Sequence, residues 1–404
     1  MHKQIAFLSL LAAFALPLAA YINVSAGDVA PVAISPADHK TVIHDLAVGT
    51  DGSVNVVWVD RRSPVPAPPP ATGTGSHAGH GGPPAGPNYA DLWFARSTDG
   101  GKTFSAPSRV NSAPQSVRAL ATSKPRLVVG ANGTVHVMWV ANRYSDAAKP
   151  TVLDAHYARS SDGGKTFSKA YALNRDLDRD AHNIDHMGVR AEHAFQGMTV
   201  TRKGEVHTFW IDSRDMPQGG DKAAIYGAIS RDDGKTFEHD RAVIKSDVCA
   251  CCQVTAAAGA DGATYLTWRN IFADGSREIV LVKSADNGKS YSAPVRLMEK
   301  KWMIDGCPLK PASVALDGKN NIWVSWYTEA DQPTGSYLVV SSDGGKTFSA
   351  PQAIHANVKG ADHAQVVALP AGGALLAWDA RIGETRSVLM RKATLSQGVV
   401  FGDR

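Results

Sequence analysis

A motif of eight residues occurs five times along this chain of 404 residues. Its pattern is Ser-x-Asp-x-Gly-x-Thr-Phe, and its copies occupy residues 97–104, 160–167, 230–237, 284–291 and 341–348. A unit that recurs at roughly 50–70 residues is typical of a propeller or solenoid, because each repeat buries its apolar face against the next. The motif also suits a tight turn, since its Asp can accept hydrogen bonds from its own loop and its Gly can adopt positive φ.

A second repeat is interleaved with the first. Six segments run from a Gly turn into a short apolar strand that ends in Trp, at residues 52–58, 133–139, 204–210, 262–268, 318–326 and 373–378. These segments are rich in Val, Thr and aromatic residues, which favour β structure. Each unit divides into four strands, as at residues 126–129, 134–140, 154–159 and 169–173. The repeated eight-residue motif, called the box below, lies between the third and the fourth strand. We predict an all-β fold, a six-bladed β-propeller with four-stranded blades.

The sixth unit has no box. Residues 30–34 resemble the fourth strands of other units, such as residues 350–354. We therefore expect the N-terminal segment to supply the closing strand of the last blade.

Residues 1–20 have the composition of a secretory signal, with Lys3 followed by an apolar run at residues 5–16. That run is too short to span a bilayer, and cleavage after Ala20 or Ala26 is predicted. We expect residues 1–26 to be a signal peptide and residues 27–404 to form a single propeller. The mature protein is then periplasmic or secreted, not membrane-spanning, and we expect it to be a monomer.

Residues 63–90 interrupt the first blade with a Pro- and Gly-rich stretch that carries His77 and His80. This composition does not form a packed core, so a flexible insertion is predicted. The formal net charge is only +4, without any run of Lys and Arg, so a nucleic acid partner is not expected.

Strand direction alternates within a blade, so the loops after the Trp strands lie on the face opposite the boxes. We call this the axial face, because the loops and the entries to the first strands converge there near the propeller axis. Five of the Trp strands are followed by an arginine, namely Arg61, Arg143, Arg214, Arg269 and Arg381. A ring of guanidinium groups suits an anionic ligand. The alternative is that these arginines tie neighbouring blades together.

Cysteine and histidine gather at the entries to the first strands. The residues are Cys249, Cys251, Cys252, Cys307, His44, His193 and His363. Thiolate and imidazole are the usual ligands of zinc and copper, so we predict a metal ion, copper first, on the axial face. The alternative for four cysteines in an oxidising compartment is two disulfides.

The repeated motif resembles the Asp box of the sialidase superfamily. The resemblance implies a Tyr nucleophile paired with Glu, an Asp acid/base and arginines that bind the sugar carboxylate. The candidates on this chain are Tyr327, Glu329, Asp60, Arg269 and Arg381, with Asp45 as a second acid/base. The Arg-Ile-Pro motif of the family is missing, and the first strand opens with His44 and Asp45 instead.

A cysteine-containing group of sialidase-like bacterial proteins is more similar. The shared segments are Cys249 to Gln253, Trp268 to Asn270, Arg277 to Ile279 and Gly306 to Pro308. We therefore expect an exported sialidase-like propeller that binds copper or zinc through Cys and His on its axial face. The alternatives are a sialidase-type glycoside hydrolase acting on an acidic glycan, and a structural propeller with disulfides only.

Overall fold

The computed structural model describes residues 32–35, 40–61, 89–120, 122–144, 152–176, 193–217, 220, 222–306, 308–355, 361–396 and 398–402. All of the regular structure in these ranges is β-strand, which confirms the all-β prediction. None of the described segments is a helix that is long and apolar enough to cross a membrane.

The strands form four sheets. The nine-stranded sheet contains β1 (Lys40–Val48), β2 (Val54–Arg61), β3 (Tyr89–Ser97), β4 (Ser108–Arg109), β5 (Val117–Arg118), β6 (Arg126–Val129), β7 (Val135–Asn142), β8 (Leu153–Ser160) and β9 (Tyr171–Ala172). The eight-stranded sheet contains β10 (His193–Val200), β11 (Val206–Asp212), β12 (Lys222–Ser230), β13 (Arg241–Cys249), β14 (Thr255–Ala258), β15 (Thr264–Ile271), β16 (Arg277–Ser284) and β17 (Val295–Arg296). The two four-stranded sheets contain β18 (Ser313–Leu316), β19 (Ile322–Thr328), β20 (Gly335–Ser341) and β21 (Gln352–Ala353), then β22 (Asp362–Ala368), β23 (Ala374–Ile382), β24 (Thr385–Leu395) and β25 (Val399–Phe401).

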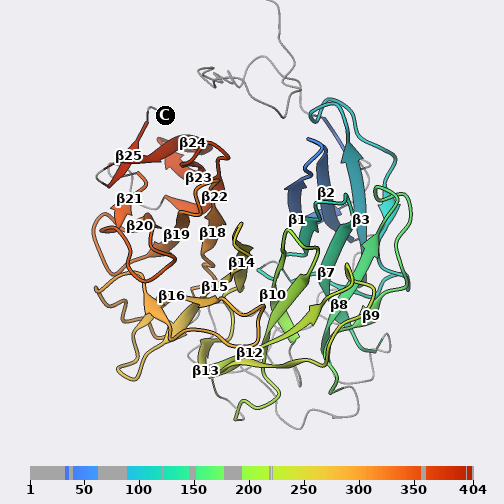
Figure 1. The fold of residues 1–404 in the computed structure, drawn as a ribbon, viewed down its shortest axis with the longest axis horizontal. Coiled ribbons are helices and arrows are strands. Elements are labelled where there is room, and N and C mark those ends of the chain that lie inside the picture. The colour runs from blue at the N-terminus through green and yellow to red at the C-terminus, as the bar shows by residue number, and fades with distance from the viewer. Residues whose placement is uncertain are drawn as a thin grey trace, which may run out of the picture.

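All strand pairs within the four sheets are antiparallel, and the short links β3–β5–β7 and β13–β15 join neighbouring units into the two larger sheets. In Figure 1 the units follow one another around a common centre in chain order. The first strands face that centre, since β1 contacts β6, β6 contacts β10, and the series continues through β14 and β18 to β22. Six closed blades of four strands stay a prediction, because the described sheets hold nine, eight, four and four strands.

Each predicted Trp strand ends in a buried tryptophan. The six are Trp58, Trp139, Trp210, Trp268, Trp326 and Trp378, and all are at most 2% exposed. A large aromatic ring at the same register position of every unit fills the space between neighbouring sheets. The Trp repeat therefore marks the core.

The five boxes fold alike. In the box at residues 160–167, the Ser160 hydroxyl donates to Asp162 at 2.7 Å and accepts the Gly164 amide at 2.8 Å. Asp162 also accepts the amide and the hydroxyl of Thr166, at 3.0 and 2.6 Å. The other four boxes repeat the Ser–Asp, Gly–Ser and Thr–Asp bonds, with Ser290 in place of Thr in the fourth.

Boxes also join one unit to the one before it. The ring of Phe167 meets the ring of Phe94 on β3 edge-on, with centroids 5.5 Å apart. Gly164 has a φ of +86°, and a Cβ built there would lie only 1.9 Å from the Phe94 ring. Glycine is therefore required at this position for two reasons: the backbone has positive φ, and the Phe94 ring leaves no room for a Cβ atom.

The predicted closing strand is wrong. The edge of β24 is paired by β25, so its backbone hydrogen bonds are already made by the C-terminal segment. The described residues 32–35 form no strand, and Ile34 packs against Val56, Trp58 and Ala95 of the first unit.

Several sequence predictions fall on other parts of the chain. The predicted signal peptide, His77, His80 and residues 63–88 lie outside the described residues. Because β3 already begins at Tyr89, the predicted insertion at residues 63–90 extends two residues too far.

Gly164→Ala tests the contact between units. We expect it to lower the free energy of unfolding by about 3 kcal/mol, since positive φ and overlap with Phe94 both penalise the added methyl group. Gly101→Ala is the matched control, because Gly101 has a φ of +90° with nothing within 4 Å of its Cβ position. It should cost about 1 kcal/mol. Equal losses for the two variants in urea denaturation would show that the contact contributes nothing.

Candidate functional site

The register of the strands separates two ends of the molecule. Thr264 at the start of β15 pairs with Ser284, where a box begins, while Asn270 near the end of β15 pairs with Glu278. The boxes and the turns between first and second strands therefore share one face. The loops after the Trp strands lie on the axial face, as predicted.

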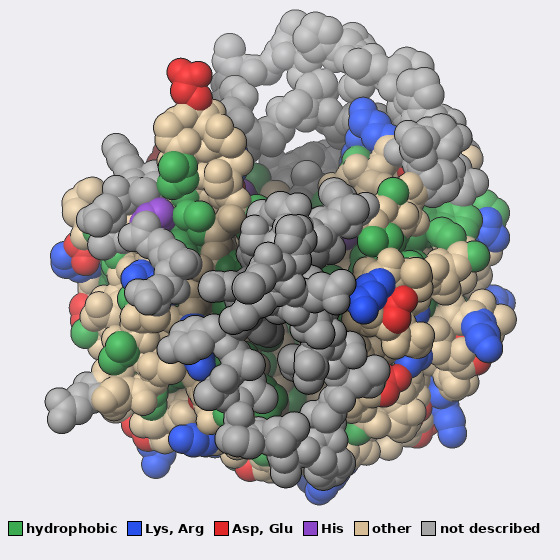
Figure 2. Space-filling model, turned by 90° about the horizontal axis from the view of Figure 1, so that it is seen from above, with side chains coloured by type: hydrophobic (Ala, Val, Ile, Leu, Met, Phe, Trp, Pro, Cys, Tyr) green, Lys and Arg blue, Asp and Glu red, His purple; other side chains and the backbone are tan. Residues whose placement is uncertain are grey.

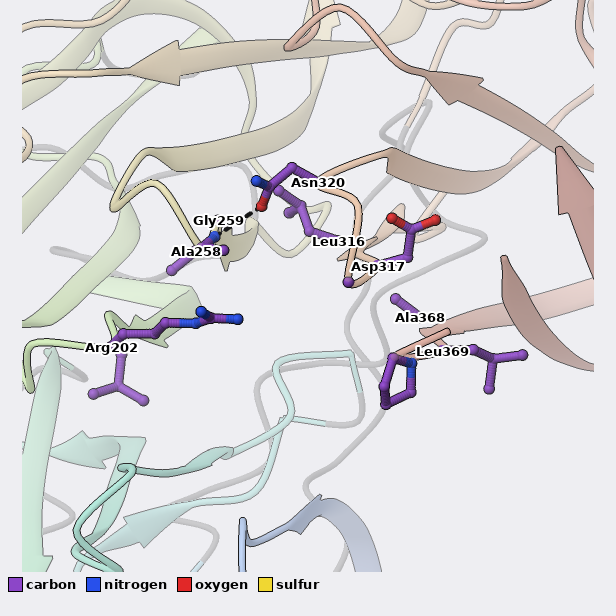
Figure 3. A pocket seen from close by; sticks show the side chains of 12 residues that line it. Arg202, Ala258, Gly259, Leu316, Asp317, Asn320, Ala368 and Leu369 are labelled. Atoms are coloured by element: carbon purple, nitrogen blue, oxygen red, sulfur yellow. Dashed lines mark hydrogen bonds between the residues drawn. The ribbon is translucent and has the colours of Figure 1, made fainter. Parts of the chain in front are cut away.

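A hollow of about 460 Å³ lies on the box face, between turns of four units (Figure 3). Its Asp317 is saturated by structural bonds, including those from the Asn321 side chain and the Trp323 indole. Asn320 accepts the amide of Ala260 across the hollow. Arg202 is the remaining charged residue that lines it, so the hollow offers one cation and little else for recognition.

The axial face carries a continuous chain of polar contacts over β19, β22 and β23. The Tyr327 hydroxyl donates to Glu329 at 2.9 Å, and the Lys310 ammonium lies 5.1 Å from the centre of the Tyr327 ring. Lys310 forms an ion pair with Asp362, and the amide of the next residue, His363, donates to Asp362 at 2.7 Å.

The chain of contacts continues to the last hairpin. His363 Nδ1 lies 2.8 Å from an oxygen of Asp379, whose other oxygen pairs with Arg386. His363 and Glu329 are exposed, Tyr327 and Lys310 are partly exposed, and Asp362 is nearly buried. This arrangement places a phenol, three carboxylates and two fixed cations within reach of a ligand on the axial face.

Tyr327 is held in its neutral form. Partial burial, the hydrogen bond to Glu329 and the charge of Asp362 together raise the pKa of Tyr327 well above its usual value. The phenol therefore becomes a nucleophile only when a base takes its proton, and Glu329 is the base in contact with it.

Arg269 does not bind a ligand carboxylate, so this prediction is wrong. Its side chain is completely buried, and its terminal nitrogens donate to the carbonyl oxygens of Arg277, Lys310 and Tyr327 at 3.3, 3.2 and 2.8 Å. The guanidinium also lies 4.9 Å from the centre of the Trp302 ring. Arg269 thus holds the backbone under Tyr327 in place.

The remaining predicted catalytic residues are dispersed. Arg381 is exposed near the end of β23, and Asp60 is buried in β2. Asp45 accepts the Leu127 amide at 2.9 Å and ties β1 to β6. The structure therefore joins Tyr327 with Glu329, and its described residues form no ring of arginines around this pair.

Other arginines of the predicted ring stabilise the fold. Arg143 binds Asp154 at 2.6 Å, and Arg61 donates to the carbonyl oxygen of Ala119 at 3.2 Å. Arg214 binds Asp212 at 2.7 Å and Asp240 at 2.8 Å. Acidic and basic side chains are interspersed in Figure 2, without a single-sign patch on the visible surface.

His193 is the centre of a buried ion network and not a metal ligand. Its Nδ1 contacts the carbonyl oxygen of Leu153, and its Nε2 lies 3.0 Å from Asp176 and 3.6 Å from Asp212. Burial alone would lower the pKa of His193, but Asp212 and Asp176 outweigh it and raise this pKa to about 9. The protonated ring has no lone pair to offer an ion.

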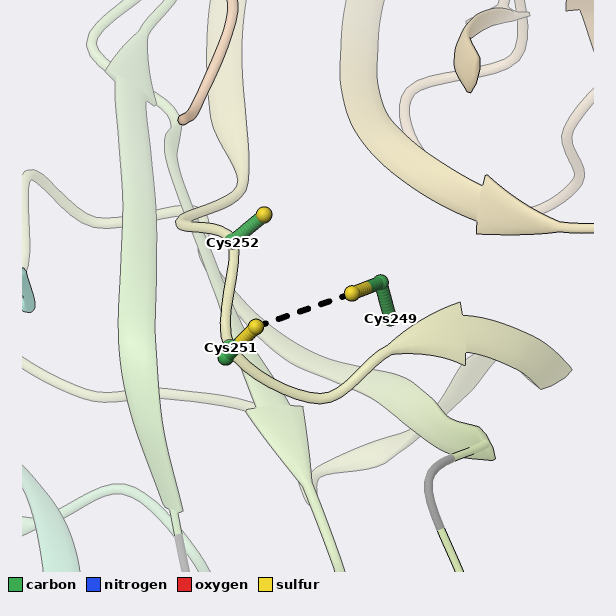
Figure 4. A group of neighbouring side chains, drawn as sticks. All are labelled: Cys249, Cys251 and Cys252. Carbon is green, nitrogen blue, oxygen red and sulfur yellow. Dashed lines mark hydrogen bonds between the residues drawn. The ribbon is translucent and has the colours of Figure 1, made fainter. Parts of the chain in front are cut away.

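The cysteines do come together (Figure 4). The Sγ atoms of Cys249, Cys251 and Cys252 lie within 4.8 Å of one another, close enough to share a soft metal ion, and all three residues are buried. None of the described histidines joins this group: His44 is exposed on β1 and His363 contacts Asp379. Cys307 lies outside the described residues.

The three clustered cysteines differ in state. Cys251 is disulfide-bonded, whereas Cys249 and Cys252 are free thiols. Metal binding at this cluster therefore stays a prediction, because the three sulfur atoms lie close enough to share an ion but the sulfur of Cys251 is disulfide-bonded. The alternative of two disulfides is wrong, since two of the four cysteines of the chain are free.

The free thiols are polarised in opposite directions. A hydrogen bond from Cys252 and the charges of Arg277 and Arg269 overcome burial and lower the pKa of Cys249 to about 6. The same hydrogen bond, with burial, raises the pKa of Cys252. Cys249 is thus the thiolate of the pair and Cys252 its proton donor.

No family model and no curated protein matches this chain. Among solved structures, a Dyadobacter fermentans protein of unknown function has a TM-score of 0.53 at 17% identity, covering 91% of this chain and 96% of that one. The α-L-arabinofuranosidase of Fusarium graminearum has a TM-score of 0.53 at 15% identity, covering 91% and 95%. A Hadza microbial sialidase has a TM-score of 0.52 at 15% identity, covering 84% of this chain and 63% of the sialidase.

These likenesses show the fold alone, which this chain shares with a sialidase and an arabinofuranosidase. The residues of the candidate site that sequence reasoning missed are Lys310, Trp302 and Arg386. Lys310 had one usable signal, its place two residues after Cys307-Pro308, in a segment already marked by its cysteine. Trp302 and Arg386 belong to no motif of the sequence, so only the fold brings them to this face.

The His193 network predicts a pH dependence of stability. Because the folded pKa of about 9 exceeds the ordinary 6.5, the stabilisation is complete below pH 6.5 and is lost as the pH rises through 9. Its size is about 3 kcal/mol. Urea denaturation at pH 6 and pH 10 should show this loss in the parent protein and in the control His363→Gln. His193→Gln should remove it, and an unchanged slope in that variant would contradict the assignment.

Proposed function

We propose that this protein is an exported sialidase-like propeller that binds and hydrolyses a glycan on its axial face. The observation that carries the proposal is the Tyr327–Glu329 pair, a phenol donating to an exposed carboxylate at 2.9 Å. The sequence of residues 1–20, with Lys3 before an apolar run at residues 5–16, supports export.

The pair supplies the chemistry of a covalent glycosyl transfer. As the Tyr327 oxygen attacks an anomeric carbon, its proton passes to Glu329, so no free phenolate is needed at neutral pH. Arg269 fixes the Tyr327 backbone through its carbonyl oxygen at 2.8 Å. The departing oxygen takes its proton from water, and Asp362 beside the ring is occupied by its ion pair with Lys310.

The substrate class follows from the charges available. Lys310 and Arg386 are each paired with a carboxylate, and Arg269 is buried, so the described part of this face lacks the arginine cluster that a sialic acid carboxylate would require. The carboxylates of Glu329, Asp362 and Asp379 face the cations of Lys310 and Arg386, and this near balance suits a neutral sugar or one with a single acidic group. Proteins with this fold include a sialidase, an arabinofuranosidase and an ulvan lyase, which supports a glycan as ligand.

Turnover of fluorogenic sialoside, glucuronide and arabinofuranoside tests the proposal. We expect the parent protein to hydrolyse at least one of them, and Tyr327→Phe and Glu329→Gln to lower kcat by about 10³-fold, because nucleophile and base are lost. Tyr226→Phe is the matched control. The Tyr226 hydroxyl also donates to a carboxylate, Asp215, at 2.6 Å, but this pair belongs to a different unit from Tyr327.

Two outcomes would overturn the proposed function. One is the absence of both binding and turnover of every glycoside by the folded parent protein. The other is full activity of Tyr327→Phe, which would move the chemistry to different residues.

A further inference from the structure

The last described sheet carries an exposed histidine that the proposed glycosyl transfer to Tyr327 leaves unused. His363 follows Asp362 at the start of β22, and Asp379 on β23 lies directly across from Asp362 in the strand register. The register shifts between Asp362 and Gln365, so His363 lies in a β-bulge. Such a bulge re-aims a side chain out of the regular alternation of a strand, and bulges are frequent beside active sites.

The backbone of His363 adopts a costly conformation. Its φ of +49° lies in the left-handed region, which costs a residue other than glycine about 1 kcal/mol. The side chain is 57% exposed, so burial of apolar surface does not offset this cost. Strain of this kind is concentrated where the position of a side chain serves a ligand or a reaction.

Asp379 fixes the orientation of the imidazole ring. His363 Nδ1 lies 2.8 Å from one oxygen of Asp379, and the other oxygen of this carboxylate pairs with Arg386. A carboxylate accepts a hydrogen bond from Nδ1–H, which leaves the lone pair of the neutral ring on Nε2. Among the described residues Nε2 has no hydrogen-bond partner. The ring therefore presents a base to solvent on the axial face.

The imidazole is a neighbour of the phenol without touching it. His363 Nδ1 lies 3.8 Å from Asp362 Oδ2, and Asp362 pairs with the Lys310 ammonium. That ammonium lies 5.1 Å from the centre of the Tyr327 ring. A base that acts on a water molecule, and not on the nucleophile itself, requires a separation of this kind.

The other groups of the site are unavailable as a base once a sugar is bonded to Tyr327. Glu329 has then taken the phenol proton through its hydrogen bond with Tyr327. Lys310 is a cation that occupies Asp362, and the carboxylate beside the imidazole is occupied by a guanidinium. Among the described groups of the site, His363 is the one left to accept a proton from water.

We propose that His363 is the general base of the hydrolytic step, an inference that rests on the proposed glycosidase function. A water molecule attacks the anomeric carbon of the sugar on Tyr327, and its proton passes to His363 Nε2 as the new C–O bond forms. The bond between that carbon and the phenol oxygen breaks, its electron pair stays on this oxygen, and Glu329 returns the proton to it. The imidazolium, stabilised by Asp379, then gives its proton to the hydroxide that the first step left in solution.

Kinetics that separate the two steps test this role. The probes are the 2,4-dinitrophenyl derivatives of sialic acid, glucuronic acid and arabinofuranose, because this leaving group departs without help and makes hydrolysis of the glycosyl–tyrosine limiting. His363→Asn removes the imidazole, and asparagine tolerates positive φ. We expect a burst of about one dinitrophenolate per chain at the parent rate, followed by a kcat about 10²-fold lower.

Azide should restore the turnover of His363→Asn, because it attacks the anomeric carbon without a proton to be removed. The product is a glycosyl azide, which mass spectrometry identifies. Asp379→Asn should lower kcat about tenfold, since the imidazolium loses its carboxylate. His239→Ala is the control, because His239 is an exposed histidine directly after the third box. Near-ultraviolet circular dichroism identifies the folded variants.

Three results would overturn the proposal while Tyr327→Phe stays inactive, and they leave the proposed glycosidase function in place. They are a parent kcat in His363→Asn, a burst that slows together with the steady state, and a slow second step that azide does not restore. The absence of both burst and turnover with every probe in the folded parent protein would instead overturn the glycosidase function and the role of His363 together.

Discussion

The contact between a box and the preceding unit, which four of the five boxes make through their glycine, is the constraint on which this structure depends. A box closes on itself through its Ser, Asp and Thr, and this leaves its glycine and aromatic ring free to press on the neighbour, as Gly164 and Phe167 press on Phe94. No unit buries both of its faces alone. The box therefore fixes the angle between units, and that angle determines which loops meet on the axial face.

Many charged side chains near the axial face stabilise the fold and are not available to bind a ligand. His193, Arg143 and Arg214 sit among carboxylates inside the fold, where burial makes each unpaired charge costly and each pair structural. At the candidate site, the polar groups that are at least partly exposed include Tyr327, Glu329 and Lys310. Function at this face therefore depends on the few polar groups that packing has not consumed.

The cysteine cluster and the Tyr327 site share one scaffold, Arg269. Its guanidinium carries a positive charge beside the sulfur atoms and donates to the backbone beneath the phenol. A buried arginine without a partner carboxylate within hydrogen-bond distance needs anionic or dipolar compensation, which backbone carbonyls and a thiolate provide. This explains why two chemically different centres lie so close together.

Local periodicity was enough to predict the strands and the buried Trp positions. It also predicted that the boxes lie on one face and the loops after the Trp strands on the opposite face. Tyr327 and Glu329 were candidates through the family resemblance, and their closeness in sequence, with Glu329 just after the end of β19, allowed them to be paired. The role of Arg269, the protonation of His193 and the bonded state of Cys251 could not be predicted. These depend on neighbours from distant segments that set burial and charge.

The sequence by itself determined the repeated unit: where strands begin, where turns need glycine, and which residues enter the core. Only the tertiary structure decided which arginine binds a carbonyl, which histidine is an imidazolium and which cysteine is a thiolate. The physical reason is that hydrogen bonds within a turn involve residues a few positions apart, whereas desolvation and Coulomb energy depend on distances in space.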